Sequence, residues 1–578
     1  MTTATPIFFG PADRPLFGWV HQPEGRMSRG TAVLCPPLHR EYISAHYSLR
    51  VLAEQLAERD ITAIRFDYAG TGDSAGSGAD PGHMEASEAS IDHALRLAED
   101  LGTTELVLVG MRMGALLAAR AAARSPRVAA LVLWDPCASG REFVREQIAL
   151  FRLTYGKAKT VHDGTEVAGF VLSAETVEHL GTLVAPDANP TVERALLLTR
   201  PDRSRAGSFG VEESRVEDAV AEGQAELMDI EPFLSTLPAS IGTIAGWLER
   251  VLPHERRAQK APDGRDEVVL EGAPGAPVTE RLVHIGADRL FGVVTTGAAD
   301  PVGPWIVFLT SGNESHVGPN RMWVDLARRW AGLGLPCLRL DLSGMGDSPP
   351  RPGRPGHVER APEAFQDVQD AVEQLARGAA APPQVAPVVL VGLCSGAYQA
   401  LDSAIDLRTQ GAIAINPVLR FPPPEAGAGR VDPRRTLCRP IDESLRSAYR
   451  RLPNWKLVHL ARQAYIAVGR LQARQKTAVR SLREMSAHGT DVLCICGRLE
   501  ADALFEGSNV PTQPRVELAP RAHVEVIEGL DHGLIPEHHR RQVADLMTRH
   551  LVSHYGGEQG GEQGPGPFVA EAPADLVP

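Results

Sequence analysis

The sequence lacks an excess of positive charge, long apolar runs and an even set of cysteines. Its 578 residues carry a formal net charge of −13, whereas a protein that binds nucleic acid through phosphates presents a basic surface. No apolar run approaches the ~20 residues of a membrane-spanning helix. The N-terminus, Met1 to Pro6, has no basic region followed by an apolar core, so we expect no signal peptide there. We therefore expect neither a nucleic-acid partner nor a membrane span.

Cysteine is scarce, and its number is odd. The seven residues are spread over the chain: Cys35, Cys137, Cys337, Cys394, Cys438, Cys494 and Cys496. This distribution favours reduced thiols and a cytoplasmic protein over a disulfide-stapled secreted one. The sequence predicts no metal site and no bound cofactor.

What the sequence does contain is an internal repeat. Leu16-Phe17-Gly18 recurs as Leu290-Phe291-Gly292, and DYAGTGDS at 67–74 recurs as DLSGMGDS at 341–348, both at an offset of 274. LVLVGMRMG at 106–114 recurs as VVLVGLCSG at 388–396, at an offset of 282. A period near 280 is too long for a solenoid. We interpret it as a tandem duplication of one domain.

Each copy alternates short apolar runs with amphipathic stretches. Strands predicted at 32–34 and 61–66 recur at 305–309 and 336–340, and helices predicted at 47–58 and 86–101 recur at 321–331 and 361–376. This alternation predicts an α/β fold in which helices flank a mostly parallel sheet. We expect a first domain at 1–252, a linker rich in Pro, Gly and charge at 253–279, a second domain at 280–555 and a disordered tail at 556–578.

The second copy carries a candidate nucleophile. Gly392-Leu393-Cys394-Ser395-Gly396 follows an apolar strand and precedes a helix predicted at 397–407. This is the G-x-nucleophile-x-G pattern of a tight strand-to-helix turn, in which side chains at the two glycine positions would clash. The helix N-terminus favours the thiolate form of Cys394. The alternative is that Cys394 is a small buried core residue.

Such a nucleophile needs a base and a carboxylate that orients the base, and in the chain the carboxylate comes before the histidine. Glu500 lies just past a strand predicted at 491–496, and Asp502 is the alternative acid. His532 lies in a loop after the last predicted strand, 523–527, and before the last predicted helix, 540–550. We therefore predict Cys394, His532 and Glu500 as a catalytic triad.

The motifs DYAGTGDS, DLSGMGDS, GLCSG, CGRLE and LDHGL resemble those of α/β-hydrolase domains, most closely the serine aminopeptidase S33 type and the exosortase-associated hydrolases. The resemblance covers nearly all of the chain outside the linker and the tail. It implies two tandem α/β-hydrolase domains, each with a helical lid insert, which in the second copy spans about 421–487. Cys in place of the usual Ser is a departure that is known from polyester synthases, dienelactone hydrolases and aminoacyl transferases. The resemblance implies the fold strongly and a substrate weakly.

An oxyanion formed at this site needs backbone donors. The N–H of Ser395, directly after the nucleophile, is one expected donor. The second is expected from the loop at 310–314, where Gly312 would allow close backbone approach. Gly312 could equally be a simple turn glycine.

The first copy lacks the triad. Arg112 occupies the nucleophile position, and a guanidinium is no nucleophile at neutral pH. An offset of 298 places Asp202 opposite Glu500, and an offset of 299 places Phe233 opposite His532. We expect a degenerate site in which Arg112 pairs with Asp202. The alternative is that the first copy only buries one face of the second.

The predicted lid of the second copy is basic. From Arg430 to Arg483, fourteen Arg and Lys residues stand against three Asp and Glu residues, a local net charge of +11. Such a surface suits an anionic acyl carrier, either coenzyme A or the phosphopantetheine thioester of an acyl or peptidyl carrier protein. The alternative is a solvated helix face.

Together these features predict an acyl-transfer enzyme that works through a covalent thioester on Cys394. With water as the acceptor, the same residues would make a thioesterase or an esterase. A second alternative is a non-catalytic binding or scaffold protein.

Overall fold

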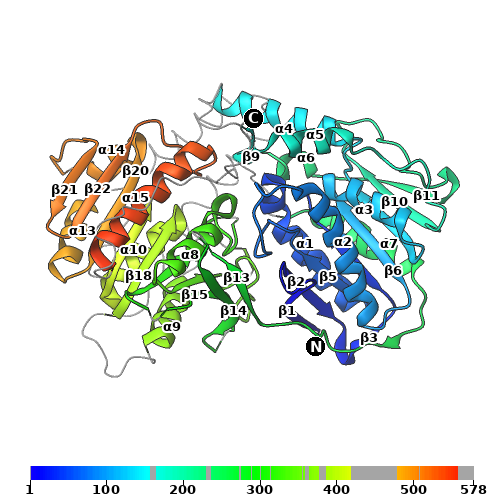
Figure 1. Cartoon of the computed structure of the whole chain (residues 1–578), viewed down its shortest axis with the longest axis horizontal. Coiled ribbons are helices and arrows are strands. Elements are labelled where there is room, and N and C mark those ends of the chain that lie inside the picture. The colour runs from blue at the N-terminus through cyan, green and yellow to red at the C-terminus, as the bar shows by residue number, and fades with distance from the viewer. Residues whose placement is uncertain are drawn as a thin grey trace, which may run out of the picture.

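Two mixed sheets, one from each copy of the repeat, form the frame of the protein. The structure is a computed structural model. It describes residues 2–156, 164–229, 236–272, 275–287, 289–299, 301–312, 314–353, 356–357, 363–376, 386–417, 478–506 and 508–556. Figure 1 shows the first domain, blue to cyan, beside the second, green to red. Phe233, Cys438, the predicted lid up to 477 and the predicted tail beyond 556 lie outside the described residues.

The first sheet has eight strands in the spatial order β1-β2-β5-β4-β6-β7-β10-β11. In that order they span Thr3–Phe9, Leu16–Gln22, Thr62–Phe66, Thr31–Cys35, Leu106–Met111, Val128–Trp134, Arg194–Thr199 and Val216–Val220. β1, β2 and β5 pair antiparallel, and every pair from β5 to β11 is parallel. The central parallel strands β4, β6 and β7 are mostly apolar because helices cover both faces of the sheet.

The second sheet repeats this order and adds one strand at each edge: β13-β14-β15-β17-β16-β18-β19-β20-β22-β21. In that order the strands span Glu267–Glu271, Pro277–Ile285, Leu290–Gly297, Cys337–Leu340, Trp305–Leu309, Ala386–Leu393, Thr409–Ile415, Asp491–Gly497, Ala522–Ile527 and Arg515–Ala519. The six strands from β17 to β22 are parallel. The prediction of two mostly parallel α/β sheets is confirmed.

Helices cover both faces of each sheet. In the first domain α1 (Arg40–Glu58) and α7 (Pro238–Val251) pack on one face, and α2 (His83–Asp100) and α3 (Met113–Arg124) on the other. In the second domain α8 (Met322–Gly332) and α15 (Glu537–Tyr555) share one face. The opposite face carries α9 (Ala364–Ala376), α10 (Ser395–Leu407), α13 (Ala478–Ala487) and α14 (Arg498–Phe505). No helix among the described residues is both long and apolar enough to cross a bilayer.

The first domain carries an insert between β7 and β10. It consists of α4 (Gly140–Tyr155), the hairpin β8–β9 (Thr165–Val167 and Phe170–Leu172) and α5 (Ala174–Thr182). The insert of the second domain lies at the corresponding place, between β19 and β20, and only its end at α13 is described. Short elements complete the described fold: η1 (Glu24–Arg26), β3 (Met27–Ser28), η2 (Glu213–Arg215), α6 (Gln224–Leu227), β12 (Arg257–Ala258) and η3 (Pro319–Arg321).

The segment 253–279 differs from the linker expected from the sequence. It runs back along the first domain, where Arg265 exchanges two backbone hydrogen bonds with Phe8. It then enters the second sheet as β13, whose pairing with β14 is antiparallel. In Glu267–Glu271, Val268 and Leu270 alternate with glutamate and valine, and both are buried. This short period-two pattern forms an edge strand.

Each domain contacts the other through the equivalent surface of the repeat. Residues at the repeat offset of 274 make reciprocal contacts, as across the twofold axis of an isologous dimer. Four pairs show this reciprocity: Asp73 with Arg339, Asp347 with Arg65, Phe17 with Phe291, and Arg40 with Glu314. The duplicated chain therefore packs as a covalently joined pseudo-dimer.

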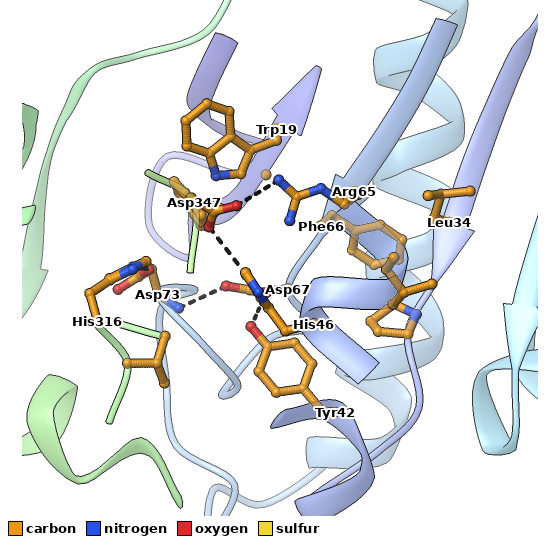
Figure 2. A pocket seen from close by; sticks show the side chains of 15 residues that line it. Trp19, Leu34, Tyr42, His46, Arg65, Phe66, Asp67, Asp73, His316 and Asp347 are labelled. Carbon is orange, nitrogen blue, oxygen red and sulfur yellow. Dashed lines mark hydrogen bonds and ion pairs between the residues drawn. The ribbon is translucent and has the colours of Figure 1, made fainter. Parts of the chain in front are cut away.

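Buried charges hold this interface together (Figure 2). Asp73 pairs with Arg339 and lies 2.6 Å from Nε2 of His316, whose Nδ1 lies 2.7 Å from Asp341. Burial alone would lower the pKa of His316, but the two carboxylates raise it well above its ordinary value. Burial alone would raise the pKa of Asp73, but Arg339 and His316 hold it well below its ordinary value. Both groups are therefore charged at neutral pH.

A small cavity of about 30 Å³ lies beside these charges. Trp19, Tyr42, His46 and Asp67 line it from the first domain, and Asp347 lines it from the second (Figure 2). This volume holds about one or two water molecules. The cavity is thus a part of the interface and is too small for an acyl substrate.

Replacing Asp73 with Asn is expected to destabilise the protein by about 3–5 kcal/mol, because Arg339 and His316 remain buried without their counter-ion. The depressed pKa of Asp73 gives stability that is complete above about pH 4 and is lost as the pH falls further. The difference in Tm between wild type and Asp73→Asn should therefore decrease below pH 4. Asp80→Asn, which removes the half-exposed pair with Arg14, is the control and should cost under about 1 kcal/mol. Equal losses for both variants would contradict this reading of the interface.

Candidate active site

Cys394 stands in a strained turn between β18 and α10. Its backbone φ and ψ are 53° and −112°, and its N–H donates to the carbonyl of Ile415 at 3.0 Å. A Cβ on Gly392 would collide with the backbone of Gly396, and one on Gly396 would lie 2.8 Å from the carbonyl oxygen of Thr310. Both glycines are therefore needed for the close approach, as the pattern predicts.

The thiol of Cys394 differs from those of the other described cysteines. Cys394 is partly exposed, whereas the others are buried. Burial raises the pKa of each of those thiols, and they stay protonated at neutral pH: Cys35, Cys137, Cys337, Cys494 and Cys496. Among the described thiols, Cys394 is the one placed for chemistry.

His532 and Glu500 lie together. The Nδ1 atom of His532, in the loop between β22 and α15, is 3.0 Å from Oε1 of Glu500, in the first turn of α14. Their side chains are 20% and 14% exposed. The contact at Nδ1 leaves Nε2 as the ring nitrogen that can serve as the base. Asp502, the alternative acid, instead accepts a hydrogen bond from Thr512 at 2.8 Å.

Asn416 is a site residue that the sequence analysis missed. It directly follows β19, has a φ of 45° and is buried. Its Nδ2 donates to the carbonyls of Asp531 and His532 at 3.0 and 3.1 Å, and its Oδ1 accepts from the N–H of Gly497 at 2.8 Å. Asn416 thus ties the strand that precedes Glu500 to the loop of His532. A polar residue between an apolar strand and Pro417 was the available signal.

The four residues meet at one edge of the sheet. β18, β19, β20 and β22 are neighbouring parallel strands, and Cys394, Asn416, Glu500 and His532 each follow the carboxyl end of one of them. Ligands of open α/β sheets bind at this edge. We therefore take it as the candidate active site.

The two expected oxyanion donors also lie there. Ser395 is the first residue of α10, where backbone N–H groups point out of the helix end. The N–H of Gly312 donates to Oγ of Ser395 at 3.0 Å. Gly312 therefore reaches the elbow, and its N–H is held by the Ser395 hydroxyl, which would have to rotate away before that N–H could bind an oxyanion.

The first domain keeps the elbow without the nucleophile. Arg112 has φ and ψ of 55° and −121°, close to those of Cys394, and its N–H donates to the carbonyl of Trp134 at 2.9 Å. Its side chain is fully buried. The same strained turn thus carries a guanidinium in the first domain and a thiol in the second.

The expected pairing of Arg112 with Asp202 is wrong. Among the described residues, the guanidinium pairs with Glu41 at 3.1 Å, Asp135 at 3.2 Å and Glu146 at 2.7 Å. Asp202 is 59% exposed and pairs with Arg200 at 2.8 Å. A buried guanidinium needs buried counter-charges, and Asp202 stands too far into solvent to supply one.

The strand register explains this error. The N–H of Asp135 donates to Leu198, as the N–H of Asn416 donates to Ile495. Counting five residues on from each carbonyl gives Glu500 in the second domain and Arg203 in the first, so Arg203 is the structural counterpart of Glu500. Arg203 pairs with Glu146. Phe233, predicted opposite His532, lies outside the described residues.

The insert of the first domain fills this degenerate site. α4 supplies Glu146 to Arg112, and Gln147 Nε2 donates to Oε1 of Glu41 at 2.9 Å. Burial raises the pKa of Glu41 to about 7, although the Arg112 guanidinium opposes this shift. Side chains of the insert thus pack against the guanidinium that stands at the nucleophile position.

Two groups of described side chains have the composition of a metal site: His316, Asp341 and Asp347 in the interface, and Asp491, His550 and His554 in the second domain. Both nitrogens of His316 contact carboxylates. Asp491 begins β20 and so lies at the edge of the sheet opposite Cys394. Neither group could bring a metal to the candidate active site.

Replacing Arg112 with Met is expected to destabilise the protein by about 3–5 kcal/mol, because three carboxylates lose their buried partner. Asp202→Asn is the matched control and should cost under about 1 kcal/mol, since its pair is exposed. Thermal denaturation of both variants measures the difference. A large loss of stability for Asp202→Asn would instead support the pairing of Arg112 with Asp202 that was predicted from the sequence.

Comparison with known proteins matches each half of the chain to a family model. The model "Alpha/beta hydrolase family" matches residues 306–546, and "Serine aminopeptidase, S33" matches residues 41–177. No curated protein matches the sequence.

Solved structures with similarity include Est1E from Butyrivibrio proteoclasticus with bound ferulic acid (15% identity, 42% of this chain and 96% of that one, TM-score 0.32). Two others are an esterase from Pyrococcus furiosus (14%, 44% and 92%, 0.30) and proline iminopeptidase from Mycobacterium smegmatis (14%, 43% and 98%, 0.30). The family matches and the shared strand order show that the chain consists of two α/β-hydrolase domains in tandem.

Proposed function

We propose that the second domain transfers acyl groups through a covalent thioester on Cys394, with His532 as the base and Glu500 as the carboxylate that orients it. The observation that carries this proposal is the contact of His532 with Glu500 at the sheet edge where the elbow presents Cys394. A partly exposed thiol at a helix N-terminus, with a paired histidine on a neighbouring loop, is the arrangement of a cysteine nucleophile.

In the first half-reaction, Nε2 of His532 accepts the proton of the Cys394 thiol. The thiolate attacks the carbonyl carbon of the acyl donor, and backbone N–H groups at the elbow stabilise the oxyanion. The bond between the acyl carbon and the donor thiol breaks, and the donor leaves with the proton from His532. The acyl group is then held on Cys394 as a thioester.

In the second half-reaction, an acceptor gives its proton to His532 and attacks the same carbonyl carbon, and Cys394 leaves as a thiol. A cysteine thioester is close in free energy to the thioester of a carrier, so transfer between the two runs near equilibrium. A serine ester would be a deeper free-energy minimum on this path. This favours thioester donors, such as acyl coenzyme A or an acyl group on phosphopantetheine, over oxygen esters.

The charge of the predicted lid fits such donors. The segment from Arg430 to Arg483 carries a net charge of +11 in the sequence, and the carriers named above are anionic through their phosphates or through acidic surfaces. If water is the acceptor, the same cycle makes the domain a thioesterase, so the identity of the acceptor separates transferase from hydrolase.

Incubating the protein with acyl coenzyme A and acyl-pantetheine thioesters should add the mass of one acyl group. Cys394→Ala should abolish this adduct, and Cys394→Ser should leave only slow hydrolysis. Intact-protein mass spectrometry followed by peptide mapping measures both. An adduct that persists in Cys394→Ala would refute the assignment of the nucleophile, and the absence of any wild-type adduct across the donors would favour a binding protein.

Glu500→Gln should lower the acylation rate by about 10²-fold or more, because the amide no longer stabilises the histidine in its cationic form. Asp502→Asn, two residues on in the same helix and paired with Thr512, should change the acylation rate by less than about twofold. Rates come from the time course of the mass adduct. The reverse pattern would make Asp502 the acid of the triad.

A further inference from the structure

The insert of the first domain contacts the loop of the second domain that carries His532. In Figure 1, β9 lies between the two domains near the start of α15. The hairpin β8–β9 turns at Ala168 and Gly169, and both residues are buried. The tip of a hairpin is ordinarily exposed to solvent, so its burial here marks a docked contact.

Polar groups join the hairpin to the loop. Oε1 of Glu166 accepts a hydrogen bond at 2.7 Å from the backbone N–H of Glu537, the first residue of α15. The guanidinium of Arg540 donates to the carbonyls of Leu534 and Ile535 in the loop and to the carbonyl of Gly169 in the hairpin. Burial lowers the pKa of Arg540 to about 10. One buried cation thus binds carbonyls of both domains.

Close packing adds to these bonds. Ala168 at the hairpin tip packs with Ile535 of the loop and with Phe151 of α4, and their exposures are 0%, 1% and 3%. Gly169 has a φ of +86°, and a Cβ there would collide with the carbonyl oxygen of Ile535 and the amide of Asn320. The fit leaves no room for a side chain at this position.

The loop needs such support. Leu534 has a φ of +54°, a conformation that costs a non-glycine residue about 1–2 kcal/mol. Inside the second domain, Asn416 holds the carbonyl of His532, and Oδ2 of Asp531 accepts from the N–H of Ile535 at 3.0 Å. These contacts and those of Arg540 hold the loop from inside the second domain, and the hairpin of the first domain adds contacts at Ile535 and Glu537.

We propose that the degenerate first domain is a positioning subunit: its hairpin β8–β9 holds the loop 531–537 in the conformation that keeps His532 beside Glu500 and available to Cys394. This inference rests on the proposed function, because it gives His532 the role of base. Glu166 and Gly169 are the positioning residues, and they act through the loop without touching a substrate. The first domain thereby contributes to a reaction that its own site cannot perform.

The test follows the alkylation of Cys394 by iodoacetamide across pH 5–9, with the site assigned by peptide mass. A thiol paired with a histidine reacts at low pH, where an ordinary thiol does not. His532→Ala gives the pH dependence of alkylation for a Cys394 thiol that has no histidine beside it. Glu166→Ala removes the acceptor of the Glu537 N–H, and Glu166→Gln keeps an oxygen in its place. Gly169→Ala adds a methyl group against Ile535.

Gly102→Ala is the matched control for Gly169→Ala. Gly102 lies in the first domain with a φ of +88°, close to that of Gly169, and a Cβ there would meet no heavy atom within 4 Å. It therefore carries the same backbone strain without the collision. If Gly169→Ala does not fold, Glu166→Ala carries the test alone, because it removes atoms and adds none.

We expect Glu166→Ala and Gly169→Ala to slow the alkylation of Cys394 at pH 6 by about tenfold or more. The pH dependence of alkylation should also move toward that of His532→Ala. The reason is that a displacement of a catalytic group such as His532 by ~1 Å can cost ~10²-fold in rate. Glu166→Gln and Gly102→Ala should retain the wild-type profile. A wild-type profile in both Glu166→Ala and Gly169→Ala, with His532→Ala shifted, would overturn the positioning role and leave the proposed function intact. A wild-type profile in His532→Ala would overturn both.

Discussion

Two buried ion pairs related by the repeat determine how the chain is assembled. Asp73 reaches Arg339 in the other domain, and Asp347 reaches back to Arg65. Each aspartate is the second-last residue of the DxxGxGDS motif of its own domain, so the motif that reveals the duplication in the sequence also forms the interface. Removing one member of either pair would leave its buried partner without a counter-ion, at a cost of several kcal/mol. The two domains are therefore fixed relative to each other, and a contact of the first domain with the second can have a defined effect.

The frame is nearly symmetric, but the two sites built on it are not. Arg112 and Cys394 have the same strained backbone and the same backbone hydrogen bond to the neighbouring strand. Asp135 and Asn416 likewise occupy one position, each with a positive φ at the end of its strand. In the first domain this position supplies a counter-ion to a buried guanidinium, and in the second it supplies an amide that ties two loops together. One geometry thus serves a stabilising ion cluster in one copy and a candidate triad in the other.

The sequence predicted what depends on local pattern and missed what depends on distant contacts. The repeat and the apolar runs predicted both sheets, and the elbow with its following strands led to Cys394, Glu500 and His532. Asp202 was assigned by an offset of 298, but hydrogen bonds to the neighbouring strands relate Leu198 to Ile495 at an offset of 297, so that Arg203 stands where Glu500 does. The strand at Glu267–Glu271 was hidden by the charged residues around it. The pairs across the interface join residues more than 260 positions apart, and no local pattern could indicate them.

The insert of the first domain links the loss of its nucleophile to the role proposed for it. A lid over a working site has to move for substrate to enter and product to leave. In the first domain α4 instead places Glu146 on Arg112 at 2.7 Å, so a largely buried ion pair ties the insert to the edge of its own sheet. The ion cluster of Arg112 thus holds α4, and α4 packs through Phe151 against Ala168 of the hairpin that we propose positions His532.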